Sequence, residues 1–176
     1  LFPHGVKAVA DAIRAEGLRP GIWFEFEVAG RDSDAFHNEG MLLKRDGATI
    51  TSQNRRFFDL RSPAVNDYIS ARMTDFLAKN GFGYIKIDYN DTYGVGCDGA
   101  ESLGEGGRQV AEESLAWLTK IKRAVPDMVI ENCSSGGSRI EPKRMNMVSM
   151  CSFSDAHECA EIPLVAANGP RVIPAR

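Results

Sequence analysis

The stretch YIKIDYN at residues 84–90 constrains the fold most strongly, because apolar and polar side chains alternate along it. Alternate side chains of a strand point to opposite faces, so the polar residues share one face and the isoleucines share the other. That polar face carries Tyr84, Lys86, Asp88 and Asn90. A cation and a carboxylate on a buried strand cost free energy unless they have partners or a function. The stretch therefore predicts a buried strand that carries either a functional site or a buried Lys86–Asp88 ion pair.

Strand-like and helix-like patterns alternate along the rest of the chain. We expect strands at 21–27, 84–90, 128–135 and 148–155, helices at 5–16, 62–80, 109–124 and 162–167, a short helix or turn at 141–146, a further element opening at 172–173, and a loop with short elements at 29–54. In the second helix Ser62 is the predicted N-cap and Pro63 the first helical residue. This alternation predicts an α/β fold with buried parallel strands.

Composition excludes several classes of function. The 176 residues are 43% hydrophobic and carry a formal net charge of −3, without a basic patch, so we expect no nucleic-acid partner. No apolar run reaches the roughly 18 residues that span a bilayer, so we expect no membrane segment. The four cysteines form no CxxC pair, and the sequence thus encodes neither a zinc site nor a disulfide framework. We expect one domain, reduced thiols and a cytoplasmic protein.

Polar residues follow all four predicted strands. In parallel α/β folds the carboxyl ends of the strands meet at one edge, where sites are formed. The four groups are Glu25 and Glu27, then Asp88 and Asn90, then Asn132, Cys133 and Ser134, and finally Ser154 and Asp155. Four such groups in register predict one convergent polar site.

Two of these acids are suited to different chemical roles. Lys86 on the same strand face favours the ionised form of Asp88, as a nucleophile requires, whereas Asp155 has no cation close in sequence and can better retain a proton. An ionised and a protonated carboxyl group across a small ligand are the minimum for cleaving a glycosidic bond. Asp155 could instead be the N-cap of the next helix.

Residues 94–99, GVGCDG, match the GxGxxG pattern of dinucleotide sites. The surrounding aspartates and glutamates would repel a pyrophosphate, and helical periodicity begins only well after Gly99. A calcium loop is excluded as well, because Tyr93 stands where such a loop needs glycine. We therefore expect neither a nucleotide nor a metal ion, and no other cofactor.

Aromatic and basic residues near the strand ends could contact a sugar. Trp23 alternates with the two glutamates of the first strand, so its indole could stack on the C–H face of a sugar ring, or it could be a core residue. Arg55 and Arg56 could reach into the site or lie on the surface. Sequence position does not decide between these alternatives.

Five motifs, in this order and spacing, resemble the melibiase-type α-galactosidases of glycoside hydrolase family 36. They are GIWFEFE at 21–27, DLRSP at 59–63, YIKIDYN at 84–90, ENCSSGG at 131–137 and the pair Ser154-Asp155. The resemblance implies a (β/α)8 barrel of which the four strands are the third to the sixth. It also implies a retaining mechanism, with Asp88 as nucleophile and Asp155 as acid/base. The implied sugar-contacting residues are Trp23, Arg55 (preferred to Arg56), Lys86, Asn90, Cys133 and Gly136.

The chain also departs from the family pattern. Phe26 stands where proline is common, and residues 156–159, AHEC, lack a second aspartate, which puts the exact substrate in doubt. A full barrel needs about 250 residues, so we expect residues 1–176 to be a fragment of a single catalytic domain, inactive alone and prone to self-association or homo-oligomers. The expected ligand is a small oligosaccharide or other α-galactoside. A glycosyl transferase of the same superfamily and a non-catalytic sugar-binding fragment are the alternatives.

Overall fold

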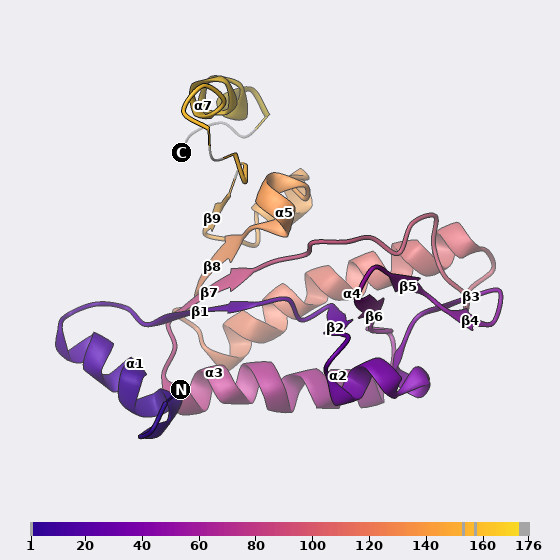
Figure 1. The fold of residues 1–176 in the computed structure, drawn as a ribbon, viewed down its shortest axis with the longest axis horizontal. Coiled ribbons are helices and arrows are strands. Elements are labelled where there is room, and N and C mark those ends of the chain that lie inside the picture. The colour runs from indigo at the N-terminus through magenta and orange to yellow at the C-terminus, as the bar shows by residue number, and fades with distance from the viewer. Residues whose placement is uncertain (1, 153, 157, 173–176) are drawn as a thin grey trace.

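The computed structural model describes residues 2–152, 154–156 and 158–172, and a parallel four-stranded sheet forms its centre (Figure 1). The strand order is β1 (Gly21–Phe24), β7 (Tyr84–Ile87), β8 (Val129–Asn132) and β9 (Met150–Cys151), and all three pairings are parallel. The predicted α/β fold with parallel strands is therefore confirmed.

The register gives the sheet one apolar and one polar face. Ile22, Ile85 and Ile130 lie side by side on β1, β7 and β8, facing the core. Trp23, Lys86 and Glu131 form the next row, on the opposite face. The helices that supply the core against the apolar face are α2 (Pro63–Ile69), α3 (Asp75–Asn80) and α4 (Leu103–Ala124).

The first helices follow the sequence pattern closely. Helix α1 spans Gly5–Ala15, and α2 begins after Ser62 with Pro63 in its first turn, as predicted, although the Ser62 side chain makes no capping hydrogen bond. A π-helical segment, Ser70–Thr74, joins α2 to α3. Gly81 ends α3 with φ of 71°, a left-handed conformation that glycine adopts at little cost.

All four strands are shorter than predicted. β1 ends at Phe24 rather than at residue 27, β7 ends at Ile87, and β9 contains two residues. Polar side chains beyond the end of β1 bond to other segments: Glu25 accepts the Asn90 N–H, and Glu27 pairs with Arg139. Phe153, within the predicted fourth strand, lies outside the described residues.

The segment predicted as a loop at 29–54 contains small antiparallel elements beyond the carboxyl end of β1 (Figure 1). They are β2 (Val28–Gly30), β3 (Lys44–Arg45), β4 (Ala48–Thr49), β5 (Thr51–Ser52) and β6 (Arg55–Phe57), with 3-10 turns at Asp34–His37 and Glu39–Met41. Pairing of β2 with β6 brings Arg55 close to the end of β1.

Helix α4 begins six residues earlier than predicted. The Ser102 hydroxyl caps it by accepting the Glu105 N–H at 3.2 Å. Glycines in its first turns hide the helical pattern, and Gly106 is required there because a Cβ would lie 2.1 Å from the Cys97 carbonyl oxygen. The helix thus starts four residues after Gly99, earlier than predicted but not at the glycine motif itself, as a dinucleotide site requires. The acidic surroundings also argue against such a site.

Three helical elements lie in the last quarter of the chain. They are α5 (Ser134–Gly137), α6 (Pro142–Met145), as predicted, and α7 (Ile162–Val172), which is longer than predicted. Ile173, which was expected to belong to a further element, lies outside the described residues. Of the helices in the described part of the chain, none has the length and apolar character to cross a membrane.

Candidate active site

Asp88 lies directly after β7, and hydrogen bonds fix its side chain. Its backbone N–H donates to the Phe24 carbonyl at 2.9 Å, which extends the pairing of β7 with β1 by one residue. Its Oδ1 accepts the backbone N–H groups of Tyr89 and Ser135, both at 2.9 Å, and its Oδ2 accepts the Trp23 indole N–H at 3.1 Å. Only 8% of the residue is exposed, so this carboxyl group has a single orientation.

These donors determine the charge of Asp88. Burial alone would raise the pKa of its carboxyl group, but the Ser135 N–H, the Asn90 side chain and the indole of Trp23 lower the pKa to about 2. Asp88 is therefore ionised at neutral pH. The sequence pattern assigned this effect to Lys86; hydrogen bonds are the larger cause, and the charge of Lys86 interacts with Asp88 in addition.

Lys86 forms its ion pair with Glu131 on β8, at 3.6 Å between Nζ and Oε1, rather than with Asp88. The alternative of a buried Lys86–Asp88 ion pair is thus wrong. Burial would lower the pKa of Lys86, but Cys133 and Glu131 raise it above the ordinary value. Lys86 is an ammonium ion whose side chain is 37% exposed, so it can still donate to a ligand.

Glu131 is a site residue that sequence reasoning missed as an individual position. Besides Lys86, it accepts hydrogen bonds from the Tyr84 and Ser152 hydroxyls, the second at 2.5 Å. Burial raises its pKa, but these hydroxyls and Lys86 bring the pKa below its ordinary value. Alternation along β8 could have identified it, since Glu131 stands between buried Ile130 and Asn132.

The turn after β8 has a left-handed backbone. Ser134 and Ser135 have φ of 49° and 56°, and Gly136 and Gly137 follow with 74° and 110°. For a residue with a side chain, such a conformation costs about 1–2 kcal/mol. Within the turn, the Gly137 N–H donates to the Cys133 carbonyl at 2.7 Å. The result is that the Ser135 N–H points at Asp88.

The same turn touches Asp155. A Cβ on Gly136 would lie 2.4 Å from the backbone nitrogen of Asp155 and 2.9 Å from its carboxyl carbon. Glycine is therefore the only residue that fits there without a shift. Asp155 itself is exposed, so the turn contacts one buried and one exposed carboxyl group.

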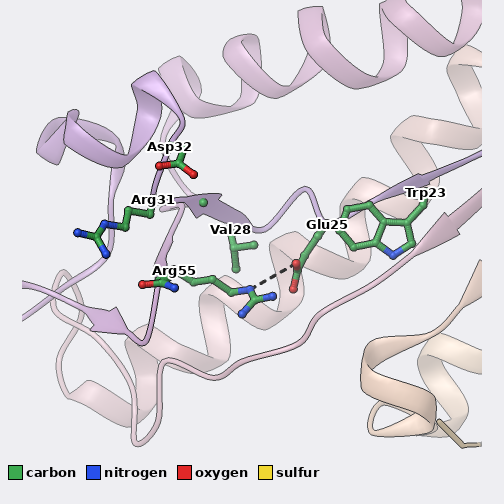
Figure 2. A pocket seen from close by; sticks show the side chains of 8 residues that line it. Trp23, Glu25, Val28, Arg31, Asp32 and Arg55 are labelled. Atoms are coloured by element: carbon green, nitrogen blue, oxygen red, sulfur yellow. Dashed lines mark ion pairs between the residues drawn. The ribbon is translucent and has the colours of Figure 1, made fainter. Parts of the chain in front are cut away.

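An open pocket of about 780 Å³ lies beyond the carboxyl end of β1, and Figure 2 shows its lining. The Arg55 Nε lies 3.5 Å from Glu25 Oε2, and the other oxygen of Glu25 accepts the Asn90 N–H at 2.6 Å. Trp23, 51% exposed, forms one wall. The lining residues are Trp23, Glu25, Val28, Gly30, Arg31, Asp32, Asn54 and Arg55.

The neighbouring basic and acidic residues point elsewhere. Arg56 donates to the Phe36 carbonyl at 2.8 Å and to the Thr51 hydroxyl at 3.1 Å, away from the pocket. Glu27, grouped with Glu25 by sequence, is 4% exposed and does not line this pocket. Cys133 is 2% exposed and interacts electrostatically with Lys86.

The structure therefore brings Trp23, Lys86, Asp88, Asn90 and Cys133 together around the ends of β1, β7 and β8, with Arg55 on the pocket wall. Gly136 and Asp155 join them through the left-handed turn. Of these residues, Trp23 and Arg55 line the open pocket, and Asp88 is joined to it through the Trp23 indole. An ionised carboxylate, an ammonium group, an indole and an exposed carboxyl group suit a polyhydroxylated ligand.

Known proteins resemble this chain over most of its length. α-Galactosidase 2 of Pediococcus pentosaceus is 30% identical over 145 residues, which is 80% of this chain and 20% of that protein. The Escherichia coli α-galactosidase is 26% identical, over 91% of this chain and 22% of its own length. The chain spans about a fifth of the length of the curated relatives it matches.

Solved structures share the fold. The α-galactosidase of Lactobacillus brevis superposes with a TM-score of 0.83 at 24% identity, covering 96% of this chain and 23% of that one. The GH36 α-galactosidase AgaA of Geobacillus stearothermophilus superposes with a TM-score of 0.83 at 24% identity. The match covers 97% of this chain and 24% of that one. A family model described as Melibiase matches residues 1–169. This chain belongs to the melibiase family.

Proposed function

We propose that residues 1–176 form barrel strands three to six of a (β/α)8 catalytic domain, and that the protein is a retaining glycoside hydrolase of terminal α-galactosides. The observation that carries the proposal is the environment of Asp88. A buried carboxylate held ionised by four donors, one of which is the Trp23 indole from the wall of the open pocket, suits a nucleophile. Residues 1–176 alone are expected to be inactive, because the remaining strands complete the sugar site.

The proposed reaction has two steps. Asp88 attacks the anomeric carbon and forms a carbon–oxygen bond, while the glycosidic bond breaks and Asp155 protonates the leaving oxygen. Asp155 then removes a proton from water, which attacks the same carbon and releases the sugar and Asp88. Retention requires the two carboxyl groups about 5–5.5 Å apart. The chemistry needs no metal ion or organic cofactor.

Several contacts support roles in sugar binding. Trp23 offers an exposed aromatic face, while Lys86, Asn90 and Arg55 offer donors to hydroxyl groups. GH36 AgaA variants of Geobacillus stearothermophilus have been crystallised with stachyose and with raffinose. We infer a ligand of that class, a small oligosaccharide with a terminal α-galactosyl group.

The test is turnover of aryl α-galactosides by the full-length protein that carries this chain. Asp88→Asn should lower kcat by at least about 10³-fold, because the nucleophile is lost. Asp91→Asn is the matched control, since Asp91 follows in the same loop and bonds to the Ser52 hydroxyl at 2.8 Å. It should change kcat by less than about fivefold.

The products distinguish the alternatives. Proton NMR during turnover should show α-galactose first, as retention requires, and β-galactose first would refute the mechanism. Predominant transfer to an added acceptor sugar would identify a glycosyl transferase. Galactoside binding without turnover, unaffected by Asp88→Asn, would identify a sugar-binding protein.

A further inference from the structure

A partly buried ion pair joins two segments near the site. Glu27 Oε1 lies 2.5 Å from Arg139 Nη1, and the Glu27 side chain is 4% exposed and that of Arg139 21% exposed. Burial lowers the pKa of Arg139, but Glu27 raises it above the ordinary value, so the guanidinium stays charged. Neither residue lines the pocket beside Trp23.

This pair connects the segments that follow three neighbouring strands. Glu27 lies in the turn after β1. The Arg139 guanidinium carbon lies 3.6 Å from the ring centroid of Tyr89, the residue directly after Asp88 at the end of β7. Arg139 itself belongs to the segment after β8. The guanidinium group of Arg139, in the loop after β8, therefore contacts both the segment that follows β1 and the segment that follows β7.

Arg139 also closes the loop that contains the left-handed turn. The Asn132 side-chain amide, at the end of β8 and 1% exposed, donates to the Arg139 carbonyl at 2.8 Å. The two ends of the loop are thus tied together around Ser134 and Ser135. A turn with unfavourable φ angles persists only when its surroundings fix it. The Ser135 N–H that reaches Asp88 depends on this constraint.

We propose that the Glu27–Arg139 pair positions the nucleophile, by fixing Tyr89 on one side of Asp88 and the turn that carries the Ser135 N–H on the other. The pair touches neither the sugar nor the reacting atoms, so both are positioning residues. This inference rests on the function proposed above. It assigns to these two side chains a role in that site. A purely structural ion pair would have no such role.

The test compares kcat, KM and local exchange in the full-length protein. Glu27→Gln should lower kcat per active site by roughly 10- to 100-fold with KM changed less than about threefold, because displacement of a reacting group by about 1 Å costs rate rather than affinity. Amide exchange of residues 133–139, followed by mass spectrometry, should become at least about tenfold faster. Arg139→Lys should keep part of the activity, since it retains the charge but not the planar contact with Tyr89.

A second variant separates positioning from stability. Replacing both partners of a buried ion pair by apolar residues often restores stability, so Glu27→Leu with Arg139→Met should fold well. Its kcat should nevertheless remain as low as that of Glu27→Gln. Full recovery of kcat together with stability would overturn the proposal.

One control variant gives the background. Glu112→Gln removes an ion pair of the same 2.5 Å length, with Lys143, but on an exposed surface. It should leave kcat per active site within about twofold and the exchange of residues 133–139 unchanged.

The two arms distinguish failure of this inference from failure of the proposed function. If Asp88→Asn leaves turnover unchanged, the proposed function fails, and the exchange measurement still decides whether the pair fixes the turn. If turnover depends on Asp88 but Glu27→Gln keeps kcat within twofold, the inference fails alone. Unchanged exchange in Glu27→Gln would overturn it in either case.

Discussion

Replacing Trp23 by phenylalanine should raise the pKa of Asp88, because the change removes the indole N–H that donates to Oδ2 at 3.1 Å. The carboxyl pKa is lowered from 3.8 to about 2, against the raising effect of burial, by donors from Ser135, Asn90, Trp23 and Tyr89. This difference corresponds to about 2.4 kcal/mol. Loss of one of four donors should therefore raise the pKa by about 0.5 to 1 unit, or about 0.7 to 1.4 kcal/mol.

The sign of the pH dependence follows from linkage. The folded-state pKa of Asp88 lies below the unfolded value, so its contribution to stability is fully present above pH 4 and is lost as pH falls through about 2. Trp23→Phe reduces that contribution. The stability difference between wild type and variant should thus be constant from pH 7 to pH 5 and shrink between pH 4 and pH 2. Packing loss adds a small pH-independent part, because Trp23 is 51% exposed.

Urea unfolding of the full-length protein between pH 7 and pH 2 measures this effect. The controls are Asp88→Asn and the double variant, because in the absence of the Asp88 carboxylate the Trp23 change should have no pH-dependent effect on stability. A stability difference that stays constant down to pH 2, or one equally large in the Asp88→Asn background, would refute the reasoning.

Three further changes test other contacts. Gly136→Ala should lower kcat by more than about 10²-fold, because its Cβ would lie 2.4 Å from the backbone nitrogen of Asp155 and φ is +74°; normal turnover in kinetic assays would contradict this. Arg55→Ala should raise KM by about tenfold whereas Arg56→Ala should not, since only Arg55 lines the pocket; equal effects would show that the pocket assignment is wrong. Glu131→Gln should lower the pKa of Lys86, because the Glu131 carboxylate raises it, and should raise KM by about threefold or more. The measurement is KM as a function of pH.

The sequence predicts the parallel sheet well, because the sheet depends on local patterns. Apolar runs and alternation identify the four strands, and the polar residues that follow them identify the edge. The choice of Arg55 over Arg56 agrees with the pocket lining. Each of these predictions depends only on residues that are close together in the sequence.

Features that depend on distant contacts were not predictable. The partner of Lys86 is Glu131, 45 positions away in sequence but adjacent in register. The early start of α4 depends on Gly106 passing close to the Cys97 carbonyl, a contact that no helical pattern records. The left-handed Ser134 and Ser135 have no local signal either, because serine is not typical of that conformation.

Two of the groups that hold Asp88 ionised are main-chain amides, those of Tyr89 and Ser135. A backbone N–H is supplied by every residue except proline, so substitution of the Ser135 side chain alone does not remove it. The charge of Asp88 therefore depends partly on the path of the main chain and not on the identity of a side chain. Homologous turns with different residues can preserve the same chemistry, provided that the left-handed path is kept.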